Sequence, residues 1–166
     1  AAFGALASTE LYRTTGKQTY AEQAAHFGRV LVQCQEQRFV DDIPITGYFY
    51  TSTRRNRVVH EHHSSFEEAP LMALRALCET FPDHPDWIEW YGASVLHSEY
   101  FQQRGTAASA PFRLIPNSVW RRDEIDALPA RSQKDSLRQF NDGTRLAEGY
   151  SLRIFPIWMD NLFHGN

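Results

Sequence analysis

Imidazole and carboxylate side chains gather in one short stretch of the chain, residues 57–70, which reads RVVHEHHSSFEEAP. Three histidines and three glutamates precede an apolar run there: His60, His62, His63, Glu61, Glu67 and Glu68. Groups of these types transfer protons, hold metal ions and bind sugar hydroxyls. Helix capping is a simpler explanation, because Ser64 and Ser65 each stand three residues before a glutamate. Capping employs one serine and one glutamate, and it does not account for the histidines.

A metal site is one interpretation of the histidines. If residues 57–63 are extended, His60 and His62 lie on one face of the strand and His63 lies on the other. Two imidazoles on one face supply two metal ligands, and a third carboxylate or imidazole must come from elsewhere. The sequence has no second half-site with recognisable spacing. We therefore expect no metal or other cofactor, and we keep a metal-dependent enzyme built on His60 and His62 as an alternative.

A second pair of carboxylates, Asp41 and Asp42, lies in the phrase FVDDIPITGYFY. Aspartates before a proline are common in turns, which is the simpler explanation for them. Cleavage of a glycosidic bond, in contrast, requires two carboxyl groups on either side of the bond, about 5–5.5 Å apart for retention or 6.5–9.5 Å for inversion. We therefore take Glu67 and Asp42 as the candidate catalytic pair.

Aromatic and arginine side chains provide candidates for substrate binding. Tyr48 and Tyr50 flank Phe49, so both phenols share one face of a strand, which is either core or a surface that stacks a sugar. Trp120 and Arg121 begin a polar group after a proline-containing loop. A solvated helix start is the simpler explanation of this group. An arginine beside a tryptophan also suits an acidic sugar, since guanidinium binds carboxylate bidentately.

The spacing of apolar residues predicts the elements that position these groups. The helical period occurs in four segments that form two antiparallel pairs, residues 3–15, 19–37, 65–81 and 85–105. Gly16 ends the first segment and Pro82 ends the third. Between the pairs, residues 45–51 and 57–60 are rich in β-forming side chains on either side of a polar turn, which predicts a β-hairpin. Residues 106–120 are interpreted as a loop with a short strand, and residues 150–158 as an extended run. Residues 121–128 and 132–141 are expected to form short helices.

Composition narrows the class of protein. The chain has 166 residues, of which 42% are apolar and 22% charged, and this suits one globular domain or a part of one. The net charge is −3 and no basic cluster stands out, so nucleic acid is not an expected partner. No apolar run reaches the roughly 20 residues that span a bilayer. Cys34 and Cys78 lie among apolar residues of helical pattern and are interpreted as buried thiols.

Three stretches together resemble the six-hairpin glycosidase superfamily, the toroidal α/α barrels of bacterial polysaccharide-degrading enzymes: ALASTELYRTTGKQTYAEQAAHF, DDIPITGYFY and HHSSFEEAPLMALRALCETFPDHPDWIEWY. The resemblance covers most of the chain as a pattern of helix pairs. It implies a mainly α fold in which helix pairs ring a central cleft and loops at one end of the inner helices carry the chemistry. The β-hairpin is then a small insertion between antiparallel helix pairs of an α/α toroid.

Two helix pairs cannot close a ring of six, so we expect an incomplete barrel. The chain opens and closes within apolar patterns, and we expect residues 1–166 to be one segment of a partial α/α-barrel catalytic domain in a longer protein. One apolar face should then lack its neighbour, either that of Phe3, Leu6 and Leu11 or that of Leu74 and Leu77.

The leading hypothesis is a glycoside hydrolase that degrades polysaccharides or oligosaccharides by carboxylate acid–base catalysis. Glu67 and Asp42 are the expected catalytic residues, and the expected substrate-binding residues are His60, His62, His63, Tyr48, Tyr50, Trp120 and Arg121. The expected partners are a carbohydrate and the remainder of the catalytic domain. A polysaccharide substrate would favour a periplasmic or secreted enzyme. A polysaccharide lyase or unsaturated-uronate hydrolase on a related barrel is a close variant.

A helical-repeat module that binds a protein is the alternative from another class. Such a module requires repeats of near-constant length and few clustered acids. Here the two helix pairs begin about 63 residues apart. The predicted β-hairpin and the HEHH cluster lie between them, which favours the enzyme.

Overall fold

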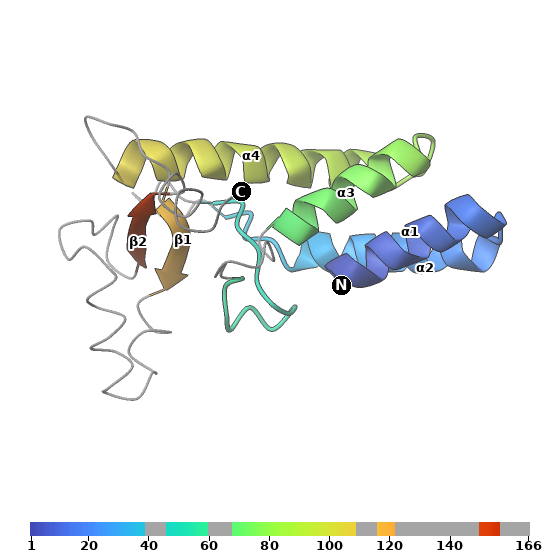
Figure 1. The fold of residues 1–166 in the computed structure, drawn as a ribbon, viewed down its shortest axis with the longest axis horizontal. Coiled ribbons are helices and arrows are strands. Elements are labelled where there is room, and N and C mark those ends of the chain that lie inside the picture. Colours follow the sequence, from blue (N-terminus) through green and yellow to red (C-terminus); the bar gives the residue numbers. More distant parts are fainter. Residues whose placement is uncertain (39–45, 60–67, 109–115, 122–149, 157–166) are drawn as a thin grey trace.

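The computed structural model describes residues 1–38, 46–59, 68–108, 116–121 and 150–156 of the chain. Within these ranges the elements are α1 (Ala2–Thr15), α2 (Gln18–Gln33), α3 (Glu68–Thr80), α4 (Trp87–Ala108), β1 (Pro116–Arg121) and β2 (Tyr150–Pro156) (Figure 1). The predicted mainly α class is confirmed. In the part of the chain described, no helix is both long enough and apolar enough to cross a bilayer.

The first helix pair, α1 and α2, is a hairpin with a two-residue connection. Gly16 ends α1 in the left-handed conformation, with a φ of 66°, and its N–H donates to the Tyr12 carbonyl at 2.8 Å. Glycine takes up this conformation without the steric cost that a Cβ brings. The sequence predicts that α2 continues to residue 37, but α2 ends at Gln33. The prediction is wrong there because residues 34–36 form hydrogen bonds with residues 46–50 instead of continuing the helix.

The second pair, α3 and α4, follows the predicted helical segments. α3 begins at Glu68 and has Pro70 in its first turn, where a missing N–H costs no helical hydrogen bond. After α3 ends at Thr80, a short turn leads into α4. Arg29 of α2 donates from Nη1 to the Asp86 carboxylate of this turn at 2.8 Å, which ties the turn to the first helix pair.

The four helices form two pairs whose connecting turns lie at the same end of the fold. α1 packs against α2 and α3, and α3 packs against α4. In Figure 1 the α1–α2 turn and the α3–α4 turn lie at one end of the helices, while the end of α2 and the start of α3 lie at the opposite end. The chain that connects α2 to α3 therefore leaves and returns at the same end of the helix pairs.

The helices are held together by a core in which small side chains alternate with large ones. Its buried members are Ala5, Ala24, Ala25, Leu31, Phe49, Ala73, Leu74, Leu77, Trp90 and Ala93. Alanines on α1 and α2 allow the helix backbones to approach closely, and Leu77 and Trp90 fill the space between α2, α3 and α4. Trp90 packs entirely within this core, since it is 0% exposed.

The two apolar faces considered in the sequence have different surroundings. Leu74 and Leu77 are both fully buried, whereas Phe3 and Leu11 are 61% and 44% exposed. α1 instead buries a face of small residues, Ala5, Ser8 and Thr9. A second group of large exposed side chains follows one face of α4 at helical spacing, namely Ile88, Tyr91 and Val95.

Residues 46–59 reverse direction where the sequence predicts a β-hairpin. An antiparallel bridge joins Tyr50 to Val58, the Thr51 N–H donates to the Arg57 carbonyl at 2.9 Å, and the Val59 N–H donates to the Phe49 carbonyl at 2.8 Å. These contacts are isolated bridges, and no strand is assigned within residues 46–59.

Strand β2 lies in a stretch that the sequence predicts to be extended, and β1 lies mostly in the stretch interpreted as a loop with a short strand. They pair antiparallel, with Trp120 opposite Ser151 and Arg121 opposite Tyr150, and the register is irregular between Pro116 and Ser118. Of the two short helices predicted at residues 121–128 and 132–141, only Arg121 is described, and it belongs to β1. The others lie outside the described residues.

Candidate functional site

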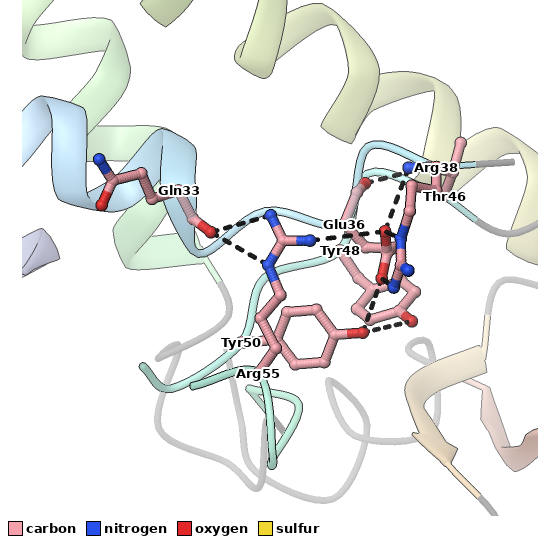
Figure 2. Close-up of polar contacts among 7 residues, drawn as sticks. All are labelled: Gln33, Glu36, Arg38, Thr46, Tyr48, Tyr50 and Arg55. Carbon is pink, nitrogen blue, oxygen red and sulfur yellow. Dashed lines mark hydrogen bonds and ion pairs between the residues drawn. The ribbon is translucent and has the colours of Figure 1, made fainter. Parts of the chain in front are cut away.

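A buried carboxylate, Glu36, organises the main polar cluster at the end of α2. Its side chain is 1% exposed. Arg38 donates to both carboxylate oxygens, from Nε at 3.0 Å and from Nη2 at 3.1 Å, and its backbone N–H adds a third bond at 3.1 Å (Figure 2). Tyr50 donates from its hydroxyl at 2.8 Å, and Arg55 Nη1 lies 4.0 Å away. A buried ion is tolerated only with such a set of charged and hydrogen-bonding partners.

The charge of Glu36 fixes the direction of the neighbouring hydrogen bonds. Burial raises the pKa of this carboxyl, but hydrogen bonds from Arg38 and Tyr50 and the charge of Arg38 outweigh burial and lower the pKa to about 2. An ionised carboxylate only accepts, so the Tyr50 hydroxyl uses its single proton on Glu36. The Tyr48 hydroxyl, 3.2 Å from that of Tyr50, is then the donor between the two phenols. At neutral pH, Glu36 has no proton to give as a general acid.

Glu36 also joins the two chain segments that flank residues 39–45. Its backbone N–H donates to the Tyr48 carbonyl at 2.9 Å, and its carbonyl accepts from the Gly47 N–H at 2.7 Å and from the Thr46 hydroxyl at 3.0 Å. The side-chain bond from Tyr50 connects the same two segments, and the bonds from Arg38 hold the Glu36 carboxylate within the first of them. Residues 36–38 and 46–50 are therefore tied together by both backbone and side chains.

Gly47 connects this cluster to α4. Its carbonyl accepts from Gln35 Nε2 at 3.0 Å and from His97 Nδ1 at 2.9 Å. Since a carbonyl cannot donate, Nδ1 carries the proton of the His97 ring. Gly47 has a φ of 93°, and a Cβ there would lie 2.3 Å from the Leu96 carbonyl oxygen, so only glycine fits.

An aromatic group packs beside these polar contacts. His97 is fully buried, with its ring centroid 5.1 Å from that of Phe49 and 5.5 Å from that of Tyr100. The Tyr48 ring lies 5.7 Å from Tyr100 and 5.3 Å from Tyr50, the latter edge to face. The end of α2, residues 46–50 and α4 thus pack against one another.

The structure describes four of the residues that the sequence nominates for the site. Tyr48 and Tyr50 lie together as the alternation predicts, but they are only 1% and 5% exposed; their phenols contact each other, and that of Tyr50 also contacts Glu36. Trp120 and Arg121 are placed by their backbone in β1, apart in sequence from the Glu36 cluster. The remaining nominated residues lie outside the described ranges: Asp42, His60, His62, His63 and Glu67.

Sequence reasoning missed Glu36, Gln35 and His97. The phrase QCQEQR reads as the solvated end of a helix, and burial of Gln35 and Glu36 follows only from the early end of α2. A signal for His97 is present in the sequence. Trp90, Ala93, His97 and Tyr100 recur at helical spacing, and all four are buried on one face of α4.

Metal binding finds no support among the described side chains. No three of the His, Cys, Asp and Glu residues in these ranges approach closely enough to hold an ion. The alternative built on His60 and His62 lies outside the described residues. Cys34 and Cys78 are both free thiols, buried and half-buried respectively.

Comparison with known proteins leaves the chain to be interpreted from its own residues. No protein-family model, no curated protein and no solved structure matches it.

Proposed function

We propose that this chain is part of a glycoside hydrolase of α/α-toroid type with a β-hairpin insertion, in which Asp42 and Glu67 form the catalytic carboxylate pair. One observation carries the proposal: the chain segments next to both residues lie at the same end of the helix pairs (Figure 1). Asp42 belongs to residues 39–45, and the residues that precede and follow this segment in the chain belong to the Glu36 cluster. Glu67 immediately precedes Glu68, the first residue of α3, in the chain.

Packing supports the mechanistic part of the proposal. Glycoside hydrolysis adds water across the bond, with one carboxyl protonating the leaving oxygen and a second acting as base or nucleophile. Such groups require a rigid support that holds their separation. The Glu36 cluster provides such a support next to Asp42, since Tyr50 fastens residues 46–50 to Glu36 on the other side of residues 39–45. Glu36 itself is ionised and buried, so its role here is support rather than proton transfer.

The exposed face of α4 supports the toroidal architecture. Ile88, Tyr91 and Val95 are 66%, 49% and 42% exposed and share one side of the helix. In a ring of helix pairs each pair has a neighbour, and an apolar face of this kind is what the neighbour would cover. The same face favours the alternative, a helical module that binds a protein. The two functions are distinguished by the hydrolysis screen described below, because a binding module cleaves no glycoside.

A hydrolysis screen tests the proposal. The purified chain is incubated with neutral and acidic polysaccharides and oligosaccharides, and new reducing ends are measured against a heat-denatured sample. We expect products that have gained one water molecule in their mass. Unsaturated products, which absorb in the ultraviolet and contain no added water, would indicate the lyase variant. A chain that cleaves no carbohydrate of the panel would contradict the proposal.

A further inference from the structure

Arg38 extends from the buried Glu36 cluster to the surface of the protein. Its side chain is 71% exposed, whereas that of its partner Glu36 is 1% exposed. One edge of the guanidinium faces the carboxylate, with Nε donating to Oε1 at 3.0 Å and Nη2 donating to Oε2 at 3.1 Å (Figure 2). The backbone N–H of Arg38 also donates to Oε1 at 3.1 Å. These three bonds fix the orientation of an exposed guanidinium without any ligand.

A second edge of the same guanidinium can take another carboxylate. The group has five N–H donors in one plane, and the bonds to Glu36 use one donor from Nε and one from Nη2. The remaining edge, formed by Nη1 and the other N–H of Nη2, points away from Glu36 because the group is planar. Arg38 Nη1 makes no hydrogen bond to the part of the chain that the structure describes. Two parallel N–H groups of this kind match the two oxygens of a carboxylate.

The charges of the cluster favour an anion at this edge. Arg55 brings a second cation, since its Nη1 lies 4.0 Å from Glu36 Oε1. Glu36 is ionised at neutral pH, because its pKa is about 2, and its hydrogen bond raises the pKa of Arg38 further above the ordinary value. Two arginines therefore surround one carboxylate, which leaves an excess of positive charge beside the exposed edge of Arg38.

Arg38 also lies close in the chain to a proposed catalytic residue. Asp42 follows it by four residues, so their Cα atoms are at most about 14 Å apart. A short oligosaccharide spans such a distance. One sugar unit can therefore contact Arg38 while another unit of the same chain reaches Asp42.

We propose that the exposed edge of Arg38 binds the carboxylate of a uronate unit, which makes the substrate an acidic glycan. The inference rests on the proposed glycoside hydrolase function and adds a substrate class to it. A uronate differs from a neutral sugar by a carboxylate in place of the hydroxymethyl group. The proposed catalytic residues, Asp42 and Glu67, are acidic and would repel such a sugar. Arg38 supplies the opposite charge that offsets this repulsion.

The experiment is a calorimetric titration of the full chain with trigalacturonate, with cellobiouronate and with the methyl ester of each. Esterification removes the charge of the carboxylate and leaves the rest of the sugar unchanged. We expect at least one acid to bind about tenfold or more tightly than its ester, as charge-assisted hydrogen bonds predict. The affinity of that acid should fall as sodium chloride is added. Acetate at the same concentration should not displace it.

Two arginine variants identify the residue responsible. Arg38→Lys keeps a cation beside Glu36 but lacks the second edge, so the preference for acid over ester should fall severalfold. Arg75→Gln is the matched control, because Arg75 is 77% exposed and also donates to a glutamate, Glu79 on α3. It should keep the wild-type preference. Thermal unfolding followed by circular dichroism verifies the fold of both variants, and the comparison of acid with ester in the wild type depends on neither.

The results separate this inference from the proposed function. If neither acid binds more tightly than its ester, or if Arg38→Lys keeps the full preference, Arg38 is not a uronate subsite. Displacement by acetate would show that the edge takes any carboxylate, and the assignment to a sugar would be wrong. Hydrolysis of glycans without a preference for acids overturns the subsite and leaves the proposed function standing. Arg38-dependent binding of an acid without hydrolysis supports the subsite and contradicts the proposed function.

Discussion

Tyr50 donates a 2.8 Å hydrogen bond to the buried carboxylate of Glu36, 14 residues earlier in the chain. The two residues stand on either side of residues 39–45, so their contact fixes where this part of the chain leaves the helices and where it returns. Since Glu36 is ionised, the bond is charge-assisted and stronger than one between neutral groups. The stability of this end of the fold should therefore depend on the charge of Glu36.

Replacing Glu36 by glutamine tests that dependence at nearly constant size. Arg38 and Tyr50 would lose a charged acceptor, and we expect the free energy of unfolding to fall by about 2 kcal/mol. Glu79→Gln is the matched control, because Glu79 also accepts from an arginine, Arg75 at 2.7 Å, but on the exposed surface of α3. It should have little effect. Denaturant unfolding measures both, and equal effects in the two variants would be inconsistent with this role of Glu36.

Acid should remove the contribution of Glu36 to the free energy of unfolding within a defined pH range. The folded-state pKa of about 2 lies below the ordinary value of 4.5, so the unfolded chain binds the proton first as the pH falls. The contribution is thus complete above about pH 4.5 and is lost as the pH falls towards 2. We expect the stability difference between the wild type and Glu36→Gln to narrow across this window. A difference that stays constant from pH 5 to pH 2 would show that the charge is not responsible.

Replacing either of two helix glycines by alanine should change the stability of the protein, but in opposite directions. At Gly28 of α2 a Cβ would lie 2.7 Å from Trp90 Nε1 and 2.8 Å from Leu77 Cδ1, both in the core, and overpacking costs about 1–3 kcal/mol. At Gly92 of α4 nothing lies within 4 Å, and alanine should stabilise the helix by about 0.5–1 kcal/mol. Thermal unfolding of Gly28→Ala and Gly92→Ala distinguishes them. A lower melting temperature for Gly92→Ala than for Gly28→Ala would contradict the packing of α2 against α4.

The two thiols should react slowly in the folded protein. Burial raises the pKa of Cys34, and burial together with the nearby charge of Glu79 raises that of Cys78. Less thiolate is then available to attack a disulfide reagent. We expect slow labelling at pH 8, slowest at the 4% exposed Cys34, and rapid labelling of both after denaturation. Native labelling at the rate of a small free thiol would refute this.

The helical part of the fold was accessible from the sequence because its signals are local. Gly16 and Pro82 mark helix ends through their backbone chemistry alone. Leu74 and Leu77 recur at helical spacing, and both are buried. On α1 the same periodicity was less informative, since Phe3 and Leu11 are exposed and the small residues Ala5 and Ser8 face the neighbouring helices. The small size of these side chains allows the close helix packing there, and a pattern of hydrophobic residues does not reveal side-chain size.

The candidate site was less accessible because it depends on contacts between distant residues. Gln35 and Glu36 resemble a solvated helix end until the chain returns through residues 46–50 and buries them. Tyr48 and Tyr50 were correctly placed together, but their common partner, Glu36, lies in a segment with no motif of its own. The roles of Asp42 and Glu67 remain predictions.

The central claim is that Glu67 takes part in carbohydrate cleavage, and the most direct measurement is the turnover of Glu67→Gln on the best substrate of the hydrolysis screen. Glu22→Gln, at an exposed position on α2, is the control for loss of a surface carboxylate. We expect Glu67→Gln to keep the wild-type melting behaviour and to lose about 10²–10⁴-fold in kcat, as removal of a general acid or base does. The Glu22→Gln control should retain full turnover. Turnover of Glu67→Gln close to that of the control would contradict the account and leave Glu67 as a helix cap.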